Sequence, residues 1–354
     1  MSRLTVHAFV VVLATLTFAA KGADRPLLRL VQTIPLPRVQ GRLDHMAVDL
    51  EQKRLFVAAV ANGSLEIVAL NSGIVINSLT GFKDTQDVLF LGGEVNKVYV
   101  TSLDGTLRIF QGETFRLVQT LKLEPDPNRL QFDPATRLIY FGYGGQNAGF
   151  DTYERVGVMQ ATPAVQSDHF IADMIAPTPR PGHLAEMAME EDGKLLVCDS
   201  RADIIFQFDT RKRQLIKSWP AAGDGAGDMS LDRSHHRLFV GSRTPPEMTV
   251  YDSLTGKEIA RLPGPAAMDG VHYDSRLKRV YVTGGRWYGT PEPSSGSIYV
   301  YQQSDADHYQ LPSKINTRPG SGTSLFVADL NRLYVASQAI EDQEAAILVY
   351  EPQP

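Results

Sequence analysis

A four-residue phrase recurs seven times along the 354-residue chain, and each copy is a basic residue followed by three apolar or aromatic ones. The copies are Arg54–Val57, Lys97–Val100, Arg137–Tyr140, Lys194–Val197, Arg237–Val240, Arg279–Val282 and Arg332–Val335. Their last residues are 43, 40, 57, 43, 42 and 53 positions apart. Such a period, filled with short β-rich pieces, is typical of propeller blades, in which each unit leaves an apolar face that only its neighbour covers.

Each copy is the second of four strands that we expect in a repeat. An apolar-alternating strand and a turn with Asp come before it, as in Gly227–Asp232, and two further strands follow, as in Ile205–Asp209 and Gln214–Trp219. In the third repeat these two strands are expected at Val156–Met159 and Phe170–Ile175. The pattern predicts an all-β fold, a seven-bladed β-propeller of four-stranded antiparallel blades.

The two ends of the chain indicate how the ring closes. The last repeat stops at its third strand, Ala346–Tyr350, and no fourth strand follows. Near the N-terminus, Arg29–Leu36 matches the fourth strand Arg116–Leu123 at six of eight positions. We therefore expect the N-terminal strand to complete the last blade, which removes the exposed sheet edges of an open array. Pro35 fits this strand only at the outer edge of the blade, where a missing N–H costs little.

The first residues have the pattern of a targeting segment. Arg3 is followed by the apolar or small run Ala8–Ala20, and small residues near Ala19–Ala23 offer cleavage positions. Thirteen residues are too few to span a bilayer comfortably, so the run predicts a signal peptide, with an uncleaved anchor as the alternative. We expect residues 1–23 to be removed and residues 24–354 to form one propeller domain, monomeric, without a membrane span, and periplasmic or secreted.

Composition excludes several classes of protein. The net charge of −5 gives no general attraction to nucleic acid, which we do not expect as a partner. Cys198 is the only cysteine, so the chain has neither an internal disulfide nor a Cys-x-x-Cys-His haem site. Because Cys198 follows an apolar strand, we expect it to be a small buried side chain at the end of that strand.

Two of the repeats carry a more specific motif. Val98–Thr101 and Val280–Thr283 both read Val-Tyr-Val-Thr, and the residues after them are Ser102 and Gly284. In repeats of this length behind a signal peptide, the motif resembles that of the YVTN-type β-propeller repeat proteins, although the fourth-position Asn of their consensus is absent. The resemblance covers about residues 27–354 and implies a seven-bladed propeller exported from a bacterial or archaeal cell. It implies little about chemistry, because function varies widely on this fold.

The first strands of all blades start around the central channel, so their first residues form a ring. The ring residues are His45, Asp87, Arg129, Glu186, Asp228, Gly270 and Ser324. Asn128 and Asp269 directly precede two of them, and His183 lies in the loop before a third. This mainly acidic funnel is either filled with water or a site for a ligand or ion. Its oxygen donors would suit Ca²⁺ or Mg²⁺, whereas zinc would require more imidazole than His45 and His183 supply. We expect no other cofactor.

Arginines gather on the same rim as the loops that precede the ring. Arg201, Arg243 and Arg286 directly follow the second strands of three successive repeats, and Trp287 comes next to the last of them. Guanidinium groups beside aromatic rings are suited to carboxylates, phosphates or planar ligands. The alternative is local pairing, for example of Arg201 with Asp203. Two insertions, at residues 142–154 and 284–293, reach the same rim. We expect a small anionic ligand or a protein partner there.

Catalytic motifs are absent from the sequence. There is no Gly-x-Ser-x-Gly elbow and no phosphate-binding glycine loop that opens a helix. We therefore expect a binding module rather than an enzyme, with His45, Asp87, Arg129, Glu186, Asp228, Asp269 and the arginines as its contact set. Two alternatives remain open. One is a lactonase-like metal-assisted hydrolase or an oxidoreductase-associated subunit, with a divalent ion or ligand in the funnel. The other is a structural module of the cell surface.

Overall fold

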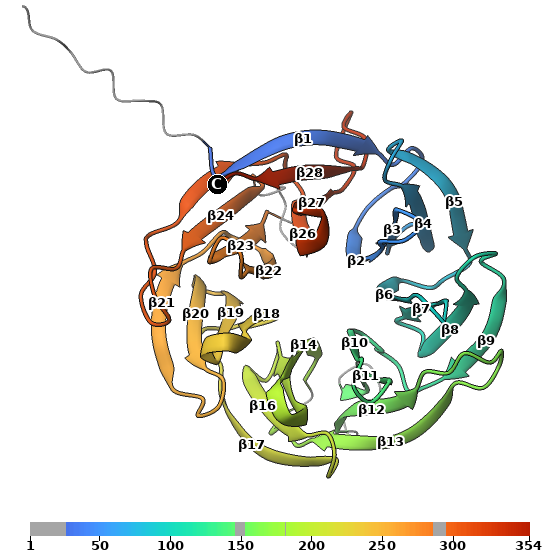
Figure 1. Ribbon diagram of the computed structural model, residues 1–354, viewed down its shortest axis with the longest axis horizontal. Coiled ribbons are helices and arrows are strands. Elements are labelled where there is room, and N and C mark those ends of the chain that lie inside the picture. The colour runs from blue at the N-terminus through green and yellow to red at the C-terminus, as the bar shows by residue number, and fades with distance from the viewer. Residues whose placement is uncertain (1–25, 146–152, 181, 286–294) are drawn as a thin grey trace, which may run out of the picture.

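The computed structural model describes residues 26–145, 153–180, 182–285 and 295–354. Within them, 28 strands form seven antiparallel four-stranded sheets that stand like blades around a central axis (Figure 1). The all-β, seven-bladed propeller expected from the repeats is confirmed. Among the described residues, no helix has the length and apolar character needed to cross a bilayer.

The first four blades follow the chain in order. Blade 1 contains β2 (Leu43–Asp49), β3 (Arg54–Ala59), β4 (Ser64–Ala69) and β5 (Ile74–Thr80). Blade 2 contains β6 (Thr85–Leu91), β7 (Lys97–Ser102), β8 (Thr106–Gln111) and β9 (Leu117–Lys122). Blade 3 contains β10 (Leu130–Asp133), β11 (Leu138–Tyr143), β12 (Glu154–Gln160) and β13 (His169–Ala176). Blade 4 contains β14 (Leu184–Glu190), β15 (Lys194–Asp199), β16 (Ile204–Asp209) and β17 (Gln214–Pro220).

The last three blades complete the ring. Blade 5 contains β18 (Asp228–Asp232), β19 (Arg237–Arg243), β20 (Pro246–Asp252) and β21 (Glu258–Pro263). Blade 6 contains β22 (Met268–Asp274), β23 (Arg279–Gly284), β24 (Ser297–Gln302) and β25 (Ser313–Asn316). Blade 7 contains β26 (Ser321–Val327), β27 (Arg332–Ser337), β28 (Ala346–Pro352) and, from the other end of the chain, β1 (Leu28–Pro35). The described residues also include three complete short 3₁₀ turns, η2 (Glu191–Gly193), η3 (Arg233–His235) and η4 (Ala328–Leu330).

The ends of the chain close the ring as expected. β1 pairs with β28 from Leu28 opposite Pro352 to Pro35 opposite Ala346 (Figure 1). β1 is the outermost strand of blade 7, so Pro35 sits where no further strand requires its N–H. The apolar cluster between blades 7 and 1 contains Ile34 beside Ile347, both without exposed surface, and burial of one such side chain stabilises by about 1.5–3 kcal/mol.

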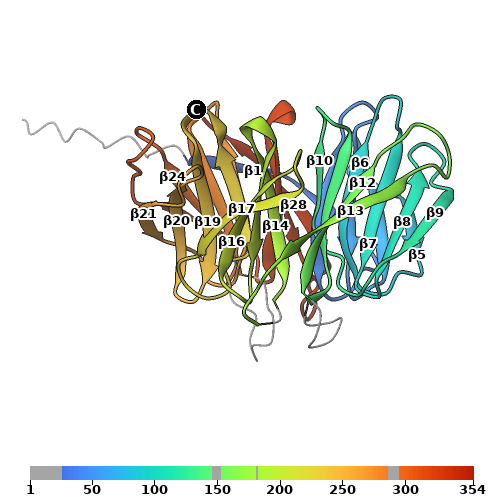
Figure 2. The ribbon, with the colours of Figure 1, turned by 90° about the horizontal axis from the view of Figure 1, so that it is seen from below.

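The propeller has two faces (Figure 2). The turn face carries the connections from first to second strands, such as residues 50–53 and η3. The loop face carries the connections from second to third and from fourth to first strands, such as residues 60–63 and 81–84. The parts of the two insertions at residues 146–152 and 286–294 lie outside the described residues, and so does the expected signal peptide.

Local hydrogen bonds explain the recurring Asp of the turn face. The Asp49 side chain accepts hydrogen bonds from the backbone N–H groups of Glu51 and Gln52, at 3.0 and 3.1 Å. Such bonds hold a tight turn. The lone cysteine is also where the sequence predicts it: Cys198 is fully buried near the end of β15, and its thiol donates to the Ala226 carbonyl at 2.9 Å.

Candidate functional site: the central channel

The first strands β2, β6, β10, β14, β18, β22 and β26 surround the axis (Figure 1). In five of them the register shifts next to the ring residue. The shift includes His45 and Asp87 and lies directly before Glu186, Gly270 and Ser324. A bulge of this kind ends regular pairing and turns a side chain out of the sheet plane. The ring that the repeat alignment predicts therefore has a structural cause in the backbone of most blades.

Arg129 is the central cation of the ring. Its Nε donates to Glu186 Oε1 at 2.6 Å, and its Nη1 lies 3.4 Å from Asp87 Oδ1. Asp87 also accepts hydrogen bonds from the backbone N–H groups of Leu130 and Val88, both at 2.7 Å. Burial alone would lower the pKa of Arg129, but the charges of Glu186 and Asp87 raise it above its ordinary value. Arg129 thus stays charged and links blades 2, 3 and 4.

Two further acids have guanidinium partners. Arg243 Nη2 lies 3.1 Å from Asp269 Oδ1, while the Thr323 hydroxyl donates to the other oxygen of Asp269. Asp44 forms an ion pair with Arg42. Burial raises the pKa of Asp44 to about 7, although the charge of Arg42 opposes the shift. Arg243 and Arg42 therefore each form an ion pair with a carboxylate of this chain.

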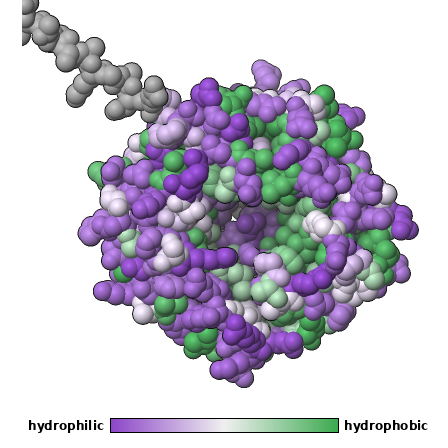
Figure 3. Space-filling view, in the orientation of Figure 1, coloured by the Kyte–Doolittle hydropathy of each residue, from purple (hydrophilic) through white to green (hydrophobic). Residues whose placement is uncertain are grey.

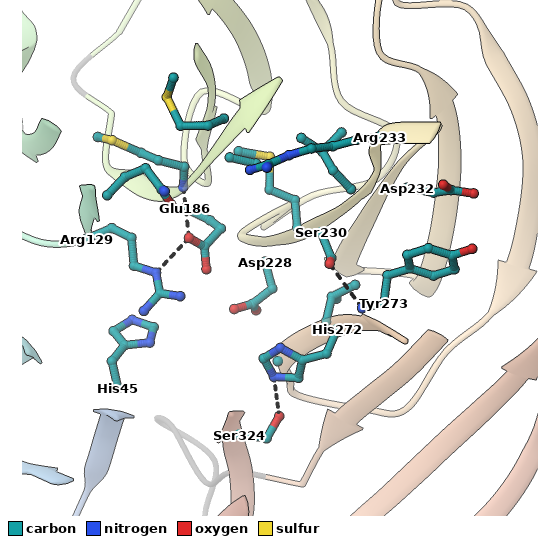
Figure 4. Close-up of a pocket in the computed structure, with 18 of the residues that line it drawn as sticks. His45, Arg129, Glu186, Asp228, Ser230, Asp232, Arg233, His272, Tyr273 and Ser324 are labelled. Carbon is teal, nitrogen blue, oxygen red and sulfur yellow. Dashed lines mark hydrogen bonds and ion pairs between the residues drawn. The ribbon is translucent and has the colours of Figure 1, made fainter. Parts of the chain in front are cut away.

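Asp228 differs from the other acids of the ring. It is 8% exposed, and no described residue forms a hydrogen bond or ion pair with its carboxyl group. It lies between the Arg129–Glu186 pair and His272 (Figure 4). Burial raises the pKa of Asp228 to about 8, the charge of Asp269 adds to the shift, and that of Arg243 opposes it. A buried carboxyl group without a partner is unfavourable in an isolated protein, so this position is the prime candidate for contact with a ligand.

Asp228 faces a cavity of about 490 Å³, which is within the usual size of small-molecule sites. Viewed from the turn face, the centre of the molecule is hollowed and shows hydrophilic residues inside (Figure 3). The cavity runs from the ring along blades 4, 5 and 6 to exposed turn-face residues such as Arg233 and Ser275. Its side chains include His45, Arg129, Glu186, Met187, Asp228, Met229, Asp269, His272 and Ser324.

Two neutral imidazoles line this cavity. Burial, helped by the charge of Arg129, lowers the pKa of His272 to about 4 and holds that of His45 well below its ordinary value. Nε2 of His272 lies 2.9 Å from the Ser324 hydroxyl. The ring position of this blade is Gly270. A Cβ there would collide with the Ser324 hydroxyl of blade 7 and approach Thr283 Oγ1 of its own blade to 2.6 Å, so only a glycine allows the neighbouring blade so close.

The other predicted site residues lie away from the cavity. Asn128 and Asp126, in the loop between blades 2 and 3, form a small network with His183, in the loop between blades 3 and 4. Asn128 Nδ2 lies 2.8 Å from His183 Nε2, and His183 Nδ1 lies 2.8 Å from Asp126 Oδ2. Arg201 follows β15, where its backbone N–H donates to Asp199 Oδ1 at 2.9 Å. Asp203, its suggested partner, instead lies 3.1 Å from Arg180. Arg286 and Trp287 are outside the described residues.

Several cavity residues were not among the predicted site residues. Gln131, Ser230 and His272 line the cavity, and each stands two positions after a ring residue. Because side chains two apart on a strand share a face, extension of the ring alignment by one pleat would have found them.

The donors of the channel are not grouped as metal ligands. Among the residues that the structure describes, no three His, Cys, Asp or Glu side chains are arranged to hold a metal ion. The carboxylates are instead divided between guanidinium groups and backbone N–H groups. The arrangement therefore fits an organic ligand better than a bare divalent ion.

No protein-family model matches the chain. The chain is similar to the uncharacterized protein YncE of Salmonella typhi, with 22% identity over 285 residues that cover 77% of this chain and 71% of the relative. YncE of Salmonella typhimurium strain LT2 matches over the same shares of the two chains, also at 22% identity. Together with the seven four-stranded sheets, these likenesses identify the chain as a β-propeller protein with YncE-like relatives.

Proposed function

We propose that this protein is an exported propeller of the YVTN type that binds a small ligand in the cavity of its central channel. The observation that carries the proposal is Asp228, a carboxyl group more than nine-tenths buried, without a described partner and directed into a cavity of about 490 Å³. Folding places it there at a cost in free energy, and a bound ligand would recover that cost.

Binding suits the site better than catalysis does. The arginines of the ring already bond to Glu186, Asp87 and Asp269, which makes them supports of the site rather than free electrophiles. Burial raises the pKa of the Cys198 thiol well above its ordinary value, so it is a poor nucleophile. A metal-assisted hydrolase would need a grouped set of ligands, which the described residues do not contain.

A cavity-filling substitution tests the proposal. Ala188 lines the cavity from β14, and Ala188→Phe would occupy part of the space without a change of charge. The matched control is Ala135→Phe at an exposed turn of blade 3. The assay is thermal unfolding of the mature protein with a panel of small cations, anions and neutral compounds.

A compound at a hundred times its dissociation constant should stabilise the wild type and the Ala135→Phe variant by about 2.7 kcal/mol. The Ala188→Phe variant should respond far less. Equal stabilisation of all three proteins would place the binding site elsewhere and contradict the proposal.

A further inference from the structure

The channel has more acids than cations. Among the residues that the structure describes, five carboxyl groups and three guanidinium groups meet around the ring, and the two imidazoles are neutral. The acids are Asp44, Asp87, Glu186, Asp228 and Asp269, and the cations are Arg42, Arg129 and Arg243. One more arginine, Arg233, lines the cavity at its exposed mouth. The charges that act on Asp228 are those of Asp269, Arg243, Glu186 and Arg129, two of each sign, so they leave its own charge uncompensated.

The cations of the ring are engaged. Arg129 bonds to two carboxylates, and Arg243 bonds to Asp269 and to the Met268 carbonyl, with its Nε 3.1 Å from that oxygen. An anionic ligand would have to compete with these short contacts. A cationic ligand would meet Asp228 without displacement of any described partner.

We propose that the cavity binds a small organic cation, whose ammonium or amidinium group is held by Asp228. This inference rests on the proposed function of the channel as a ligand site. The walls fit such a ligand, because Met187 and Met229 line the cavity with polarizable side chains and the neutral rings of His45 and His272 lie on either side of Asp228 (Figure 4). An ion without an organic body would lack the grouped donors that it needs.

When the cation binds, Asp228 releases a proton. With its pKa raised to about 8, Asp228 is mostly protonated at neutral pH in the empty site. A cation binds the ionised form, so the proton leaves on binding. For a ligand whose own charge is fixed, affinity should approach a tenfold loss per pH unit below about 8, and about a hundredfold loss at pH 6.

Three probes have nearly the same shape and differ in charge. They are benzamidine, which stays cationic between pH 6 and 9, neutral benzamide, and anionic benzoate. Titration calorimetry of the mature protein at pH 9 should show the tightest binding for benzamidine. The Asp228→Asn variant should weaken benzamidine at least tenfold and remove the pH dependence. The control Asp224→Asn, an exposed acid shortly before β18, should change neither.

The outcomes separate the two levels of the proposal. If benzoate binds best, if the three probes bind alike or not at all, or if Asp228→Asn has no effect on benzamidine, the cation inference is wrong. If the Asp228→Asn variant does not fold, the pH dependence of benzamidine affinity in the wild type decides instead. An affinity that is constant from pH 6 to 9 overturns the inference. Binding of any probe that Ala188→Phe leaves unchanged contradicts the proposed function itself.

Discussion

Glu154 and Asp199 bring two buried carboxyl groups together between blades 3 and 4. They are 1% and 0% exposed. Asp199 Oδ1 accepts hydrogen bonds from three backbone N–H groups, those of His183, Arg201 and Ala202, at 3.0, 2.9 and 2.8 Å. Burial would raise the pKa of Asp199, but the hydrogen bonds from Glu154 and the backbone lower it. Asp199 is thus the ionised member of the pair.

Glu154 is the protonated member. Neither of its carboxyl oxygens has a hydrogen-bond donor among the described residues. Burial, followed by the hydrogen bond to Asp199, raises its pKa from 4.5 to about 10. The folded protein therefore holds a proton that the unfolded chain releases above about pH 4.5, and the free energy of unfolding falls as the pH rises between these values.

The magnitude follows from the shift. Each pH unit in this window costs about 1.4 kcal/mol of stability, so Glu154 alone removes about 4 kcal/mol between pH 5 and pH 8. The variant Glu154→Gln keeps a donor for Asp199 and does not titrate. Its stability should fall by about 4 kcal/mol less than that of the wild type over this range. Asp44 and Asp228 titrate in both proteins, so their contributions cancel when the free energy of unfolding of one protein is subtracted from that of the other.

Denaturant unfolding followed by circular dichroism at pH 5, 6, 7 and 8 measures this difference. The exposed acid Glu113 provides the control variant Glu113→Gln, whose curve should run parallel to that of the wild type. If the Glu154→Gln curve also runs parallel to the wild type, the carboxyl pair does not share a proton and the reasoning fails.

Three further predictions test the fold and the ring. Ile34→Ala, at the strand that closes the propeller, should cost about 2–5 kcal/mol in denaturant unfolding, and a loss under 1 kcal/mol would mean that the closure contributes little. Arg129→Met leaves Glu186 and Asp87 without their cation and should cost about 3–5 kcal/mol at pH 7, with part of the stability regained in acid; an unchanged pH profile would speak against the ion pairs. Cys198 should resist a thiol reagent in the native protein and react after unfolding, and rapid native labelling would show that its burial is incomplete.

The sequence predicts the architecture because the strands repeat. The match between Arg29–Leu36 and Arg116–Leu123 predicts the pairing of β1 with β28, and the structure confirms it. The same alignment predicts that the ring residues start the first strands, but in the structure only Asp228 begins its strand, whereas the others stand within the first strand or, for Arg129, directly before it. Repetition therefore carries information about distant contacts that a single strand pattern cannot provide.

The contacts within the channel could not be predicted in the same way. The choice of Glu186 and Asp87 as partners of Arg129 depends on distances across three blades. Asn128 and His183 share the composition of a ligand site but bond to each other in the loops. The extension of the cavity to the turn face depends on small residues such as Ala188 and Ser230, which carry no chemical signature in the sequence.

The most direct test of the account is a crystal structure of the propeller, residues 26–354, grown with benzamidine at pH 9. We predict an amidinium group within hydrogen-bond distance of the Asp228 carboxylate, with the Arg129–Glu186 and Arg243–Asp269 pairs intact. Benzamidine bound at another surface, with only water beside Asp228, would contradict the account.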